Sequence, residues 1–125
     1  MTKVSFQEGL RTIESNAFAH CVKLEKVDIP RTLEMAGMCA FHKCSSLQDV
    51  NIEEGSLSLI GERAFDGCVK LQTITIPSTV ARIKSHTFSC CDSLGVIKFQ
   101  NGLKYVSDYA FYSCKNLQSV ALPEQ

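Results

Sequence analysis

Residues 10–29, LRTIESNAFAHCVKLEKVDI, decide the fold, because their pattern of apolar positions returns four more times along the chain. Each copy is anchored by a phenylalanine, 23 or 24 residues after the previous one: Phe18, Phe41, Phe65, Phe88 and Phe111. A cysteine follows each anchor three residues later: Cys21, Cys44, Cys68, Cys91 and Cys114. A leucine follows six residues later: Leu24, Leu47, Leu71, Leu94 and Leu117. Such a period is typical of a solenoid, in which stacked turns bury the apolar residues that one turn cannot bury alone.

The repeats fill the chain and predict a single repeat domain over residues 1–125, made of one partial and five full repeats. Val4 and Phe6 occupy the places that Val27 and Ile29 hold one repeat later, so the first repeat is partial. The one irregularity is an extra residue within 53–56, EEGS. We interpret this stretch as an exposed turn, because an addition there shifts no buried side chain.

Two periodicities alternate within each repeat. In residues 24–29, LEKVDI, apolar and polar residues alternate, which predicts one half-buried strand per repeat and a parallel sheet with strands about 4.8 Å apart. The segment before the strand has apolar residues three and four positions apart, but Gly37 and Gly61 lie within two copies and disfavour a full helix. We therefore predict an extended stretch from Leu10 to Ile13, then a short helical or 3₁₀ turn over residues 17–21, which makes an α/β repeat.

The frame Leu-x-x-Ile-x-x-x-Ala-Phe-x-x-Cys-x-x-Leu-x-x-Val-x-Ile-Pro resembles the BspA-type leucine-rich repeat, a family of bacterial and protist surface proteins. Its five consecutive copies cover essentially the whole chain. The resemblance implies a right-handed leucine-rich-repeat solenoid that acts by binding, often in cell attachment, at the cell surface or in the secreted fraction. The chain departs from the better-known leucine-rich frame because no Asn recurs after the strand, where Thr32, Ser56, Thr79 and Gly102 stand instead.

Seven cysteines in a short chain suggest disulfides, but their spacing favours a structural role. Five of them form what we name the cysteine ladder, the position three residues after each anchor. We predict that these side chains point inward as small apolar residues with weak S–H donors. Cys39 and Cys90 lie outside the ladder, and we expect them to be the exposed thiols.

Metal binding and catalysis are both disfavoured by the residues. Cys39, His42 and Cys44 form the densest group of candidate metal ligands, with Cys68 one repeat away. Structural zinc needs matched pairs of ligands, whereas Cys44 belongs to the ladder and His42 has no His or Cys counterpart in the other repeats. A catalytic nucleophile needs a base within reach, but Cys91 is predicted to point inward, and no Gly-rich phosphate loop or nucleophile elbow is present. The sequence predicts no enzyme activity, metal or cofactor.

Charge and hydropathy exclude further classes of partner. The chain has 13 basic and 13 acidic residues, a net charge of zero, and no basic run, which disfavours nucleic acid and anionic membranes. No apolar run approaches the roughly 20 residues that a membrane helix needs, so membrane insertion is not expected. The first residues, MTKVSF, are strand-like and do not resemble a signal peptide.

Residues that alternate with the buried strand positions predict polar columns on the exposed face of the sheet. We name ten of them as the candidate binding surface: Lys26, Asp28, Gln48, Asp49, Asn51, Gln72, Thr73, Thr75, Val96 and Lys98. Their mostly short polar side chains suit many weak hydrogen bonds. The sequence thus predicts a non-enzymatic adhesion or interaction module for a protein or glycan partner.

The alternative is a structural spacer or assembly segment of a longer repeat protein, acting through its solenoid ends. A solenoid normally needs terminal caps with polar outer faces. Here Val4 and Phe6 stand at one end and Val120 and Leu122 at the other. Apolar ends of this kind predict end-to-end self-association.

Overall fold

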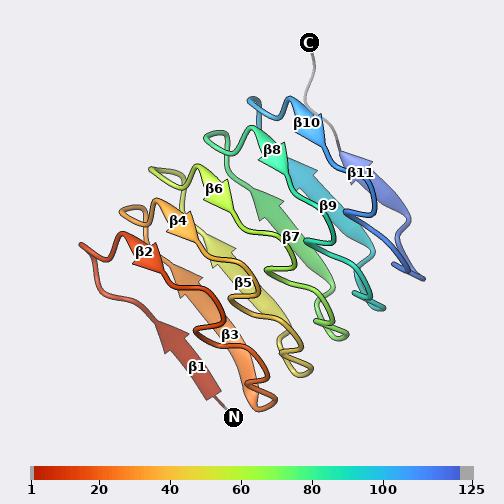
Figure 1. The fold of residues 1–125 in the computed structure, drawn as a ribbon, viewed down its shortest axis with the longest axis horizontal. Helices are drawn as coiled ribbons and strands as arrows, with labels where there is room; N and C mark the ends of the chain where they lie inside the picture. The colour runs from red at the N-terminus through yellow and green to blue at the C-terminus, as the bar shows by residue number, and fades with distance from the viewer. Residues whose placement is uncertain (1, 122–125) are drawn as a thin grey trace.

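Six longer strands line one side of the molecule, in the computed structural model that describes residues 2–121 (Figure 1). They are β1 (Thr2–Ser5), β3 (Leu24–Ile29), β5 (Asp49–Ile52), β7 (Thr73–Ile76), β9 (Val96–Phe99) and β11 (Ser119–Ala121). They pair in parallel, in the orders β1-β3-β5 and β7-β9-β11. The predicted parallel-sheet solenoid is confirmed, with about five turns.

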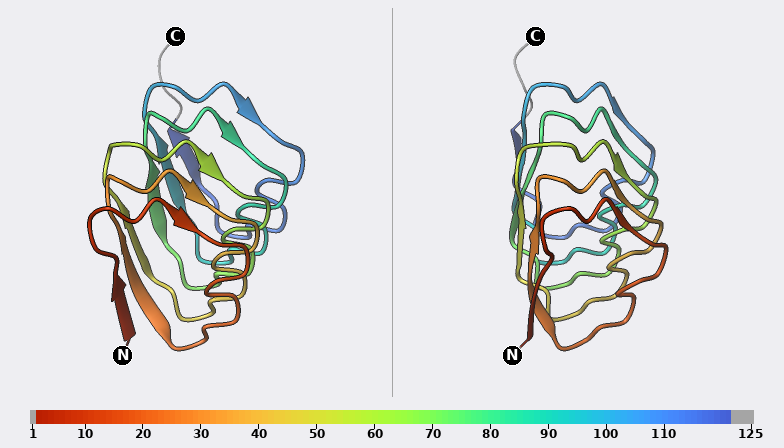
Figure 2. Two further views of the ribbon diagram at one scale, coloured as in Figure 1. Left: turned by 60° about the vertical axis from the view of Figure 1, so that its left-hand side comes forward. Right: turned by 90° about the vertical axis from the view of Figure 1, so that its left-hand side faces the viewer.

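A second set of strands runs along another side of the stack (Figure 2). These two-residue strands are β2 (Thr12–Ile13), β4 (Met35–Ala36), β6 (Leu59–Ile60), β8 (Arg82–Ile83) and β10 (Tyr105–Val106). They pair in parallel as β2-β4-β6 and β8-β10. The sequence predicted an extended stretch here but only one strand in each repeat. A strand of two residues is too short to show the alternation of apolar and polar residues that identifies a strand.

The predicted helical or 3₁₀ turn is wrong, since residues 2–121 contain no helix. In its place, short turns are closed by hydrogen bonds such as Cys21 N to Phe18 O at 3.2 Å. Asn16 and His20 have φ angles of 63° and 62°, in the left-handed region that a right-handed helix cannot contain. The same two positions have positive φ in every turn: Cys39 and Lys43, Arg63 and Gly67, His86 and Cys90, Tyr109 and Ser113. The fold is therefore a β-solenoid rather than an α/β repeat.

The anchor phenylalanines stack through the centre of the solenoid. Phe41 lies 5.5 Å from Phe18 and 5.4 Å from Phe65 between ring centroids, with interplanar angles of 6° and 7°. Phe88 continues the stack at 5.6 Å from Phe65 and 5.8 Å from Phe111. The three inner rings are at most 1% exposed, whereas the rings of the two end turns are half-buried. The anchors are thus the core that the period predicted.

The cysteine ladder joins each turn to the one before it. Each thiol after the first donates a hydrogen bond to the carbonyl oxygen of the preceding anchor: Cys44 to Phe18 (3.1 Å), Cys68 to Phe41 (3.3 Å), Cys91 to Phe65 (3.1 Å) and Cys114 to Phe88 (3.0 Å). All seven cysteines are free thiols, and burial raises the pKa of Cys44 to about 11. The predicted structural role is confirmed. Cys90 is exposed as expected, but Cys39 is half-buried.

Hydroxyl groups replace the Asn of the better-known leucine-rich frame at two positions. Thr32 Oγ1 donates to Leu10 O at 2.9 Å and accepts from Gly9 N at 2.9 Å. Thr79 Oγ1 donates in the same way to Leu57 O. Gly102 has a φ of 136°, and a Cβ there would lie 2.0 Å from a backbone oxygen of the previous turn, so only glycine fits.

The strand pairing is interrupted at one boundary, which we call the seam. Among residues 2–121, β5 does not pair with β7 and β6 does not pair with β8, so both ladders break between the same two turns. The extra residue lies in the turn before the seam, within residues 53–56, which are all exposed as interpreted above. Pro77, after the seam, has no N–H, whereas its counterparts Glu53 and Gln100 donate to Ile29 O (3.2 Å) and Ile76 O (3.1 Å).

Other contacts hold the two halves together across the seam. Phe65 N donates to Thr87 O at 2.9 Å on the side of the turns. The carboxylate of Glu54 accepts hydrogen bonds from Ser78 N at 2.8 Å and Ser78 Oγ at 2.7 Å. The stacked anchors also continue through this boundary. At the seam, the backbone hydrogen bonding between successive turns therefore continues on the side of the turns and is interrupted on both strand sides.

Candidate functional site

Eight of the ten candidate residues lie on the longer strands, where strand register aligns them. Lys26 lies opposite Asp49, and Asp28 lies opposite Asn51, on β3 and β5. Thr73 lies opposite Val96, and Thr75 lies opposite Lys98, on β7 and β9. The other two, Gln48 and Gln72, immediately precede β5 and β7.

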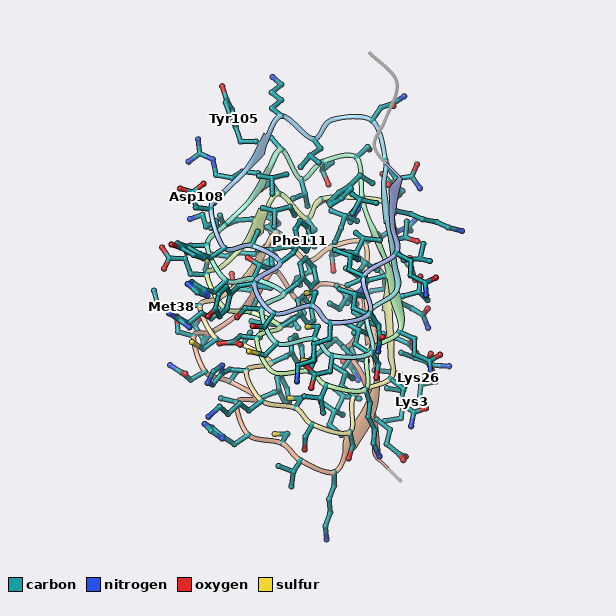
Figure 3. All side chains as sticks on the ribbon, turned by 90° about the vertical axis from the view of Figure 1, so that its right-hand side faces the viewer. Lys3, Lys26, Met38, Tyr105, Asp108 and Phe111 are labelled. Atoms are coloured by element: carbon teal, nitrogen blue, oxygen red, sulfur yellow. The ribbon has the colours of Figure 1, made fainter. Side chains whose placement is uncertain are left out.

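The exposure of these side chains varies along the sheet. Seven are exposed: Gln48, Asp49, Asn51, Gln72, Thr73, Thr75 and Lys98. Three are half-buried: Lys26, Asp28 and Val96. In Figure 3, Lys3 and Lys26 project from the strand side, away from the side that carries Met38 and Tyr105.

Asp28 is the centre of a hydrogen-bonded network on β1, β3 and β5. Its carboxylate accepts from Asn51 Nδ2 at 3.0 Å and from Ser5 Oγ at 3.2 Å, and pairs with Lys3 Nζ at 3.2 Å. The hydrogen bond from Asn51, followed by that from Lys3, lowers the pKa of Asp28. Two of the candidate residues, Asp28 and Asn51, therefore hold each other in place, and Asp28 has few acceptor positions left for a ligand.

The seam forms a shallow depression on the sheet face, with a volume of about 250 Å³. It brings four candidate residues together with Glu53, which the sequence did not single out; the lining residues are Asp49, Val50, Asn51, Ile52, Glu53, Thr73, Ile74 and Thr75. A second depression of about 250 Å³ lies beside it and is lined by Lys3, Glu25, Lys26, Gln48 and Asp49. Four candidate residues line neither depression: Asp28, Gln72, Val96 and Lys98.

The candidate metal ligands Cys44 and His42 have different partners in the structure. Cys44 donates to the backbone of the previous turn, while His42 Nδ1 lies 3.4 Å from Asp66 Oδ2. Asp66 also pairs with Arg63 at 3.2 Å and accepts from Ser89 Oγ at 2.8 Å. Burial lowers the pKa of His42, and the carboxylate of Asp66 opposes this shift. Within residues 2–121, no three His, Cys, Asp or Glu side chains gather as metal ligands.

The part of the chain that the structure describes also has no helix with the length and apolar character needed to cross a membrane.

Comparison with known sequences identifies one family. A family model described as the BspA type leucine rich repeat region matches residues 11–125 in six copies. No curated protein gives a significant match to the chain.

Solved structures with the same fold come from bacteria. One is a leucine rich cell surface protein from Faecalibacterium prausnitzii A2-165, with a TM-score of 0.85 and 27% identity over 98% of this chain and 32% of that one. Another is a leucine-rich repeat protein from Bacteroides ovatus ATCC 8483, with a TM-score of 0.74 and 27% identity over 94% of this chain and 36% of that one. A leucine rich repeat protein of T. pallidum has a TM-score of 0.64 and 25% identity over 98% of this chain and 70% of that one. The chain spans about a third of the length of the first two.

Proposed function

The chain belongs to the BspA-type leucine-rich repeat family, and we propose that it is a non-enzymatic interaction module that binds a protein partner through the exposed face of its strand sheet. The observation that carries this proposal is the depression at the seam, where the polar columns supply Asp49 and Asn51 from β5 and Thr73 and Thr75 from β7 as lining residues. A solenoid sheet offers such columns as an extended contact surface with a fixed spacing between side chains.

The chemistry of the face favours a protein over a glycan. The face carries side chains of both charges, such as Lys26 and Asp49 on neighbouring strands, which suits a partner with complementary charges. Neither depression is lined by an aromatic ring on which a sugar could stack. A glycan partner is the competing outcome of the test below.

We also propose that the module works at the cell surface. Support comes from the similar protein of Faecalibacterium prausnitzii, which is described as a leucine rich cell surface protein. At the cell surface, such a binding face would act in adhesion.

The test compares variants of the face in a capture experiment. Thr73→Arg and Thr75→Arg change exposed positions and leave the core intact, and Glu62→Arg is the matched control at an exposed position away from the sheet. Partners captured by the unaltered chain from a surface-protein extract should be lost with the face variants and kept with the control. Equal capture by all variants would contradict the proposal, and capture that survives protease treatment of the extract would point to a glycan.

A second candidate function, that of a structural segment acting through its ends, is favoured by the exposure of apolar residues in the end turns. Val106 and Val120 are 46% and 38% exposed, whereas their partners in register, Ile83 and Ile97, are fully buried. At the other end, an apolar depression of about 410 Å³ is lined by Val4, Phe18, Cys21, Val22, Lys23 and Leu24. Leu122, which the sequence also assigned to an end, lies outside the described residues.

A further inference from the structure

All three tyrosines of the chain lie within residues 105–112, in a protein without tryptophan, and the rings of Tyr109 and Tyr112 contact each other. Tyr105, Tyr109 and Tyr112 are 59%, 62% and 53% exposed. Figure 3 shows Tyr105 projecting into solvent on the side away from Lys3 and Lys26. We name this surface the tyrosine patch, formed by Arg82, His86, Tyr105, Tyr109 and Tyr112.

Contacts order these side chains in two groups, Arg82 with Tyr105 and His86 with Tyr109 and Tyr112. His86 stacks on Tyr109 with ring centroids 5.4 Å apart and an interplanar angle of 8°. Tyr112 packs edge-on against both, at 6.0 Å from His86 and 5.7 Å from Tyr109. The guanidinium of Arg82 lies 5.1 Å from the ring centroid of Tyr105. A surface ordered in this way loses little side-chain entropy when it binds.

The repeat frame does not require tyrosine at these positions. The counterparts of Tyr109 in the first three turns are Asn16, Cys39 and Arg63. The counterparts of Tyr112 in the first four turns are small or polar: Ala19, His42, Asp66 and Ser89. The core of this turn is supplied by Phe111. The tyrosines are therefore additions to the surface rather than parts of the core.

The charge around the patch is mostly positive. Residues 82–86 and 104–112, which contain the patch, carry three basic side chains and one acidic side chain besides His86, although the whole chain is neutral. Arg82 lies opposite Tyr105 on the neighbouring turn, and Lys104 directly precedes Tyr105; both are exposed, while Asp108 contributes one exposed carboxylate beside Tyr109. Such a surface attracts a partner with negative charge.

We propose that the tyrosine patch is a second docking surface, which binds an acidic segment of a partner protein. Its rings contact apolar side chains of that segment, and Arg82 and Lys104 pair with its carboxylates. Tyrosine and arginine are the residue types that dominate binding energy in protein interfaces. The rings are less suited to sugars, because one face of Tyr109 is covered by His86 and one face of Tyr105 by Arg82.

Tyrosine fluorescence provides a direct assay, because every tyrosine of the chain lies in the patch and no tryptophan masks the emission. The probes are a short peptide of alternating glutamate and leucine, a matched lysine–leucine peptide and a neutral oligosaccharide. The acidic peptide should change the emission saturably, and added salt should weaken its binding. No saturable response to the acidic peptide, or a response to the oligosaccharide alone, would overturn the proposal; the second result would point to a glycan.

Variants locate the binding site with a labelled form of the acidic peptide. Arg82→Gln and Tyr109→Ala each change an exposed side chain and should weaken binding by about tenfold or more. Two variants are used so that a folding defect in one leaves the other informative. Unchanged affinity in both would contradict the proposal. Thr75→Arg, on the strand sheet, is the control and should bind the peptide normally, so failure of this proposal and failure of the sheet-face function are separate results.

Discussion

The anchor phenylalanine at position 65 lies between the rings of Phe41 and Phe88 and is 1% exposed. We predict that Phe65→Ala lowers the free energy of unfolding by about 3–5 kcal/mol, because it removes buried apolar area and leaves a cavity in the stack. Glu62→Ala, an exposed change three residues away, should cost less than about 0.5 kcal/mol. Denaturant melts measure both values, and equal losses would mean that the stack does not stabilise the fold.

Thiol reactivity tests the cysteine ladder at the same scale. We expect Cys90 to react first with iodoacetamide, because it is the one exposed cysteine. Cys68 and Cys91 should react only after unfolding, since burial raises the pKa of both thiols and each donates to a backbone carbonyl. Peptide mapping by mass spectrometry gives the order of modification. A native disulfide between two ladder positions would contradict this account.

The seam gives the longer strands unequal surroundings. Strands β3 and β9 are paired on both edges, whereas β5 and β7 each have one unpaired edge in the middle of the solenoid. Because alternate amides of a strand point to opposite edges, about half of the amides of β5 and β7 lack a ladder partner. We predict that these amides exchange with solvent faster than those of β3 and β9 in hydrogen-exchange NMR. Uniform protection of all four strands would show that the seam is closed in solution.

Strands could be predicted from the sequence more fully than the turns between them. Alternation identified the strand residues and, through register, the columns of the candidate surface. The helical turn was predicted wrongly because apolar residues three and four apart suit both a helix and successive turns. Asn16, His20 and Gly67 are residue types that favour positive φ, but Cys39 and Arg63 show no such preference, so the turns left no consistent signal.

The seam and the tyrosine patch could not be derived from the periodicity. The extra residue within 53–56 was visible in the sequence, but whether the strands of two successive turns pair depends on their backbone geometry, which the periodicity does not contain. The patch depends on the direction in which its side chains leave the backbone. For Tyr109 this direction follows from its positive φ angle, which the sequence does not reveal. One signal was available: three tyrosines within a short stretch of a chain that lacks tryptophan.

At the scale of the whole molecule, the two ends present different apolar surfaces. An end-to-end contact would join unlike faces, Val106 and Val120 of one copy against Val4 and Phe18 of the next, and could extend without closing. We predict that the isolated chain self-associates with rising concentration. Val4→Ser and Phe6→Ser should shift it towards monomer, and Glu62→Ser, an exposed change outside the ends, should not. Sedimentation analysis measures the masses, and a monomer at all concentrations would contradict association.

The two positions with positive φ in each turn differ in residue type from repeat to repeat, unlike the core positions. The core frame repeats with few changes, yet these ten positions hold asparagine, histidine, cysteine, lysine, arginine, glycine, tyrosine and serine. Positive φ at a non-glycine residue costs of the order of 1 kcal/mol, and glycine would avoid that cost. The chain uses glycine only once there, and it places His86, Cys90 and Tyr109, its chemically most distinctive exposed or half-exposed side chains, at such positions. Each turn therefore offers two positions whose side chains can be exchanged. A new binding residue can be introduced there, in any turn, without repacking the core.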